Sequence, residues 1–135
     1  KESAGRSVEA LKQSGSYTAF DVEQTAFASF LEFAREHKEI YRSIDESEFV
    51  DPQAQRTHYE ATAARILTRL QDGSARGELR GDVNEAHAWA LMGMNVFLGL
   101  RFAVWSDDWT TEQVAEAARS ILECGIANHA GSEEK

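Results

Sequence analysis

The sequence predicts an all-α fold, a bundle of about five helices joined by short connections. Apolar residues recur at three- and four-residue steps over most of the chain, which is the spacing of one face of an α-helix. No stretch alternates apolar and polar residues for long enough to form a strand. The 135 residues contain one proline, and their length and apolar content fit one domain with its own core.

The first two helices are expected before residue 46. Residues 4–14 have the pattern of a short amphipathic helix. Asp21 and Gln24 have the spacing of a capping box, in which two side chains satisfy the free N–H groups of a helix start. We therefore expect a long helix from Val22 to about Asp45.

Two further helix starts follow. Asp51 and Pro52 supply a cap and a first-turn proline for a helix that ends in the glycine-rich stretch DGSARGELRGD. Asp82 and Glu85 form another capping-box pair, which opens a helix running to about Trp105.

The last helix is expected to begin at Thr110, with Gln113 completing its capping box, and to stop at Gly125. The expected organisation is the end of a linker helix and a loop at 1–20, a ligand-binding and dimerisation domain at 21–128, and a frayed tail at 129–135.

Residues 88–105, AWALMGMNVFLGLRFAVW, are apolar on every side of the expected helix, with Asn95 and Arg101 the two polar residues. A membrane span is disfavoured because a central Arg costs roughly 2.5–3.5 kcal/mol to insert. Such a helix otherwise lies in a core or is shared between subunits. Gly93 and Gly99 suggest tight packing or room for a ligand. We therefore expect a homodimer and no membrane contact.

The charge of the chain excludes some partners. There are 23 acidic and 14 basic side chains, for a net charge of -9, whereas binding DNA requires clustered Lys and Arg. The single cysteine, Cys124, allows no intrachain disulfide and favours a reducing compartment, so we expect a cytoplasmic protein. The polar start lacks an initiator Met, so Lys1 is expected not to be the start of the gene product.

No catalytic motif is recognisable. The four histidines lack metal-ligand spacing, and Cys124 lies at a helix end, where the helix dipole disfavours a thiolate. There is no phosphate-binding loop, nucleophile elbow or dinucleotide fingerprint. We expect a protein that is not an enzyme and that holds no metal or cofactor.

Two stretches carry a family resemblance: FLEFAREHKEIYRSIDESEFVDP and GELRGDVNEAHAWALMGMNVFLGLRFAVW, followed by an amphipathic helix with ILECGI. In this order they resemble the C-terminal domain of the tetracycline-repressor (TetR) family of bacterial transcriptional regulators, over roughly Phe27 to Ile126. The resemblance implies a TetR-like C-terminal helical bundle that binds a small molecule and dimerises through its last two helices. The family's DNA-binding helix-turn-helix is absent from this chain, so DNA would be contacted only through a domain preceding Lys1.

The resemblance implies an effector-binding and dimerisation domain that controls DNA binding allosterically. The aromatic and Met residues favour a lipophilic effector, and the resemblance implies a fatty-acyl or aromatic acyl thioester. The alternative is a stand-alone helical homodimer that binds a ligand or a protein partner without contacting DNA.

Three helix faces are expected to converge on a mostly apolar pocket with a few polar groups. The residues expected to bind the ligand are Phe30, Ala34, His37, Tyr59, Ala63, Ile66, Trp89, Met92, Asn95 and Val96. The alternative is that these residues pack on one another as a solid core.

The expected dimer interface comprises Gly99, Phe102, Ala103, Val114, Ala118, Ile121 and Leu122. If Gly99 lies on that seam, Gly99→Glu should break the dimer before it unfolds the protomer.

Overall fold

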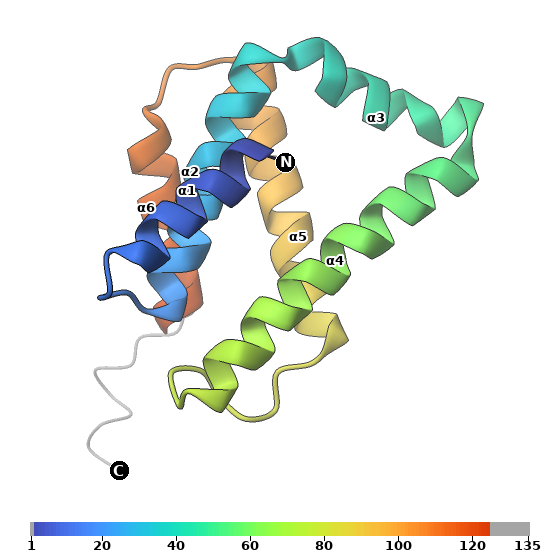
Figure 1. Ribbon diagram of the computed structural model, residues 1–135. Helices are drawn as coiled ribbons and strands as arrows, with labels where there is room; N and C mark the ends of the chain where they lie inside the picture. The colour runs from blue at the N-terminus through green and yellow to red at the C-terminus, as the bar shows by residue number, and fades with distance from the viewer. Residues whose placement is uncertain (1, 125–135) are drawn as a thin grey trace.

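The computed structural model describes residues 2–124, which form six α-helices and one π-helical segment and contain no strand (Figure 1). The elements are α1 (Glu2–Gln13), α2 (Ala19–Glu36), α3 (Lys38–Val50), α4 (Pro52–Ala75), α5 (Glu85–Gly99), η1 (Leu100–Trp105) and α6 (Thr111–Cys124). The predicted all-α class is confirmed. The predicted stop at Gly125 and the predicted frayed tail lie outside the described residues.

Two of the predicted helix caps are correct. Asp51 caps α4, where its Oδ1 accepts the N–H of Ala54 at 3.1 Å. At the start of α6, Thr110 and Gln113 exchange side-chain and backbone hydrogen bonds of 2.9 and 3.1 Å.

Two other caps lie elsewhere than predicted. Thr18, not Asp21, caps α2, and Asp21 is its capping-box partner, so the helix starts earlier. Asn84, not Asp82, caps α5, because the carboxylate of Asp82 is paired with Arg80 instead. In both cases a neighbouring polar side chain competes for the same role.

The long helix predicted from Val22 to about Asp45 is wrong, because it breaks at His37. The backbone of His37 has φ -130° and ψ 53°, outside the helical region. Its imidazole stacks on Phe33 with centroids 4.4 Å apart, and its Nδ1 lies 3.2 Å from the Phe33 carbonyl oxygen. The ring thus occupies the end of α2, and α3 leaves in a new direction towards the start of α4 (Figure 1).

The buried apolar residues form two clusters. Core one joins α2, η1 and α6 through Phe27, Leu31, Ala34, Ala103, Val114, Ala115 and Ala118. Core two joins α4 and α5 through Ala63, Ile66, Leu70, Ala88, Leu91 and Met92. Met94 on α5 packs against both cores. The apolar helix therefore serves both cores of one protomer.

The π-helical segment η1 continues α5, and side chains from other helices bind carbonyl groups near it. The Tyr41 hydroxyl on α3 donates to the Val96 carbonyl at 2.5 Å. Burial, with contributions from Tyr59 and Asp45, raises the pKa of Tyr41 to about 12, so this donor keeps its proton at neutral pH. Arg35 on α2 donates to the Phe102 carbonyl through Nε and Nη2, at 3.2 and 2.8 Å. These bonds tie η1 to α2 and α3.

A third face of α5 is open. Trp89 is 38% exposed and Phe97 is 70% exposed, and Gly93 lies between them at four-residue spacing. Trp105, at the end of η1, is 69% exposed. The stretch Glu85–Trp105 is long and apolar enough to cross a bilayer by length and composition alone, and 33% of its most apolar window is buried in this structure.

Most residues of the predicted dimer interface lie inside the protomer. Gly99, Ala103, Val114 and Ala118 are buried inside the protomer, because α6 turns its apolar face towards α2. Of the remaining three residues, Phe102 and Leu122 are half-buried, and Ile121 is 44% exposed.

The two glycines of α5 should respond in opposite ways to alanine. A Cβ at Gly99 would lie 2.8 Å from Cε2 of Phe30, whose ring neighbours Phe27 and Tyr41. A Cβ at Gly93 would meet nothing within 4 Å.

We expect Gly99→Ala to lower the free energy of unfolding by about 1 kcal/mol through overpacking. Gly93→Ala should raise it by roughly 0.5–1 kcal/mol, the helix preference of alanine. Urea unfolding at one fixed protein concentration measures both. Shifts of the same sign would contradict the close contact between Gly99 and Phe30.

Candidate functional site

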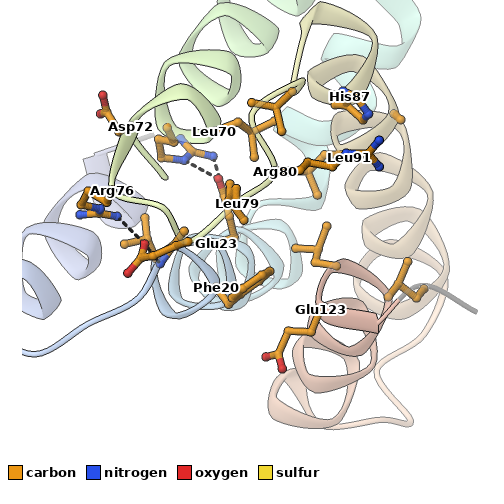
Figure 2. Close-up of a pocket in the computed structure, with 18 of the residues that line it drawn as sticks. Phe20, Glu23, Leu70, Asp72, Arg76, Leu79, Arg80, His87, Leu91 and Glu123 are labelled. Atoms are coloured by element: carbon orange, nitrogen blue, oxygen red, sulfur yellow. Dashed lines mark hydrogen bonds and ion pairs between the residues drawn. The ribbon is translucent and has the colours of Figure 1, made fainter. Parts of the chain in front are cut away.

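A cavity of about 540 Å³ lies at the end of the bundle where α4 passes into α5. Its walls come from the end of α1, the start of α2, the end of α4, the α4–α5 loop, the start of α5 and the end of α6. Figure 2 shows side chains from these elements directed towards one space. The apolar lining residues are Ala19, Phe20, Val22, Leu70, Leu79, Val83, Ala90, Leu91, Met94, Ile121 and Leu122.

The position of the cavity follows from the two cores. Leu70 and Leu91 in its wall belong to core two, and Met94 packs against both cores. Core one closes the space between α2 and α6, whereas core two closes the space between α4 and α5. The start of α2 and the end of α4 are left facing each other without a shared apolar cluster.

An ion pair spans this gap. Glu23 on α2 is 7% exposed, and its two carboxylate oxygens accept from Nε and Nη2 of Arg69 on α4 at 2.9 and 3.0 Å. The bidentate geometry is the strong form of this interaction. Both residues line the cavity, so the pair forms part of its polar wall and links α2 to α4 (Figure 2).

A second polar link fixes the α4–α5 loop. Glu78 accepts the N–H of Ala19, at the first residue of α2, at 2.9 Å and pairs with Arg76 at 3.1 Å. The Arg76 guanidinium lies 5.2 Å from the centre of the Tyr17 ring. The loop is thereby tied to the start of α2, with Leu79 turned inward against Gly73.

A much smaller void, of about 10 Å³, adjoins the cavity. Glu23, Leu91, Met94 and Leu122 line both spaces. The small void is also lined by Asn95, whose Oδ1 is buried and has no hydrogen-bond partner among the described residues.

The structure distributes the ten predicted ligand-binding residues differently from the prediction. None of them lines the 540 Å³ cavity. Five pack together in or against core two: Tyr59, Ala63, Ile66, Met92 and Val96. Ala34 belongs to core one and Phe30 packs against it. His37 ends α2, Trp89 faces outward, and Asn95 lines the small void.

Seven of these ten residues thus pack in or against the two cores. Tyr59 is half-buried, and burial raises the pKa of its phenol, with smaller contributions from Asp45 and Glu48. It therefore stays neutral beside Tyr41.

Sequence reasoning missed most of the cavity wall. Leu79 stands in the glycine-rich stretch DGSARGELRGD, which marked a helix end, and Val83 directly follows that stretch. Apolar residues within an otherwise polar loop were the available signal. Phe20 was assigned to the connection before α2, although it lies in the first turn of that helix.

Within residues 2–124, no three His, Cys, Asp or Glu side chains gather in a metal-binding arrangement. Comparisons with family models, with curated proteins and with solved structures gave no match to the chain.

Removing one partner of the Glu23–Arg69 pair should destabilise the protein more than removing both charges. Arg69→Met leaves the Glu23 carboxylate buried without a counter-charge, and we expect a loss of about 3 kcal/mol in the free energy of unfolding. Glu23→Gln combined with Arg69→Met removes the buried charge and should recover more than half of that loss. Urea unfolding of the single and double variants decides; a double variant less stable than Arg69→Met would refute this role.

Proposed function

We propose that this chain is the effector-binding and dimerisation domain of a TetR-like transcriptional regulator, and that its effector is a lipophilic small molecule bound in the 540 Å³ cavity. The observation that carries the proposal is the cavity itself. Its volume lies within the roughly 300–1,000 Å³ of small-molecule sites, and its lining is mainly apolar with a few polar groups. The all-α fold and the motifs that resemble the family support the same assignment.

The composition of the wall favours a ligand with an apolar body. Leucine, valine, phenylalanine and methionine side chains form its interior, and charged side chains stand around them. An acyl chain fits such an interior, so a long-chain acyl thioester is the first effector class to test. The charged part of such a molecule would lie at the rim, where Lys12, Arg76 and Arg80 are exposed.

The open face of α5 supports a homodimer. A surface with Trp89, Phe97 and Trp105 exposed along one helix and its extension is unusual for a monomer. Two copies of a chain with a net charge of -9 repel each other, so a contact between them needs an uncharged surface. After Glu85, α5 contains no Asp, Glu, Lys or Arg, and aromatic residues are the usual anchors of interfaces.

The proposed mechanism is a shift of population. The cavity touches α1, both cores and α6, so an occupant that fits one arrangement of these elements better than another stabilises it. α1 lies at the N-terminal end of the chain and packs on α2 (Figure 1). A DNA-binding domain attached before α1 would receive the change through this helix.

Filling the cavity should abolish ligand binding. Ala90 is exposed on α5 and lines the cavity, so Ala90→Trp would place an indole in it. Ala86, one turn earlier and also exposed, does not line it, so Ala86→Trp is the matched control. We expect Ala90→Trp to weaken binding of the neutral dye Nile red and of a long-chain acyl thioester at least tenfold, equivalent to about 1.4 kcal/mol. Fluorescence titration measures this. Equal affinities for the two variants would place the binding site elsewhere.

A charge on the open face of α5 should prevent dimerisation without unfolding the protomer. We expect the wild-type protein to scatter light as a species of twice the 15.0 kDa chain mass, and Phe97→Glu to scatter as a monomer. Phe49→Glu is the control, since Phe49 is 84% exposed but lies on α3. Circular dichroism should show unchanged helicity in both variants. A wild-type monomer at micromolar concentration would exclude the dimer, and a dimeric Phe97→Glu variant would move its interface away from this face.

A further inference from the structure

Asn95 is the described residue with a buried polar side-chain atom, its Oδ1, that lacks a hydrogen-bond partner. An acceptor left unpaired in a protein interior costs free energy, and native proteins pair nearly all of them with protein groups, water or ligands. The void beside Asn95 measures about 10 Å³, which is close to the volume that one polar atom such as a water or hydroxyl oxygen requires.

The void and the large cavity share part of their lining. Leu91, Met94 and Leu122 line both spaces. Methionine is unbranched and changes shape easily, and Met94 is the residue at which the two cores meet. Since Met94 packs against both cores, a ligand in the cavity that reaches the void displaces this side chain from its contacts with them.

The charges around the two spaces are balanced. Four basic and four acidic side chains line the large cavity, namely Lys12, Arg69, Arg76 and Arg80 with Glu23, Asp72, Glu78 and Glu123. The two ions that line the small void are already paired: Glu23 with Arg69, and Arg119 with Asp21 at 2.7 Å and with Glu123. The hydrogen bond from Arg119 lowers the pKa of Asp21, so this carboxylate stays ionised at neutral pH.

We infer that the cavity and the void form one binding site for an amphiphile with a neutral hydrogen-bond donor, and that Asn95 is the residue that recognises this group. The apolar body fills the 540 Å³ cavity, and its hydroxyl passes between Leu91, Met94 and Leu122 to donate to Oδ1 of Asn95. This inference rests on the proposed function, because it names the ligand chemistry of the same cavity.

A charged group is selected against at the end of the ligand that enters the void beside Asn95. Glu23 and Arg119 both line the void and are already paired, so neither a carboxylate nor an ammonium group would find an unpaired counter-charge there. An ion taken from water without a partner loses far more than a hydroxyl does. The site thus selects neutral polar groups over ions of the same chain length.

Four probes of matched length test the inference on the wild-type protein: octan-1-ol, heptyl methyl ether, octanoate and octylammonium, each competing with Nile red at neutral pH. Octan-1-ol should bind tightest, since it alone combines a neutral head with a donor. We expect its affinity to exceed that of the ether by about three- to tenfold, the value of one neutral hydrogen bond, and that of either ion by more.

Asn95→Leu should remove the preference for the alcohol over the ether while leaving the affinity for the ether unchanged. The unliganded variant should melt no lower than wild type, because it loses an unpaired polar group and no hydrogen bond. A lower melting temperature would show that the amide has a structural partner and would overturn the inference.

The outcomes separate this inference from the proposed function. If all four probes bind wild type with similar affinity and Ala90→Trp abolishes their binding, the cavity binds lipophilic molecules but Asn95 does not select them. If no probe binds, or if binding survives Ala90→Trp, the proposed function fails and the inference fails with it.

Discussion

The arrangement of this protein depends on a part-buried ion pair between α2 and α4, in which the Glu23 side chain is 7% and the Arg69 side chain 30% exposed. Core one holds α2 against α6 and η1, and core two holds α4 against α5, so no apolar cluster joins α2 directly to α4 near the α4–α5 loop. Glu23 and Arg69 make that connection with two hydrogen bonds. Apolar side chains in their place would tend to collapse on each other. The ion pair instead forms part of the cavity wall.

The long apolar helix contributes to both cores and to the molecular surface. α5 and η1 present one side to core one, another to core two and a third to solvent. Such a helix has a weak amphipathic pattern because all three of its faces are apolar: two pack in the cores and one is exposed. The wider turns of η1 disturb the regular backbone ladder, and Tyr41 and Arg35 bind carbonyl groups at Val96 and Phe102. Tyr41 on α3 and Arg35 on α2 thus hold this helix from both sides of the bend between α2 and α3.

Sequence reasoning identified the class of fold and most helix starts because caps and periodicity are local signals. It misplaced the caps at Thr18 and Asn84 by a few residues, since several polar side chains near a helix start compete for one role. It missed the break at His37 because Tyr41 and Ile44 continue the apolar period across it. A change of chain direction at a single residue does not interrupt that apolar periodicity.

The candidate site was harder to predict for a physical reason. An apolar residue on a helix face has the same pattern whether it packs against a neighbour or lines a cavity, and Ala63 and Ile66 are packed. A cavity forms where elements far apart in the sequence do not pack closely against each other. Here the most distinctive residues of its wall are polar. Glu23 and Arg69 are separated by 46 residues, and neither belongs to a recognisable motif. Asn95 stands out in the sequence as a polar residue in an apolar run, but only the structure shows that its acceptor is unpaired and lies next to a cavity. A buried polar group with no partner inside the protein is therefore the more informative guide to a ligand than the apolar surface around it.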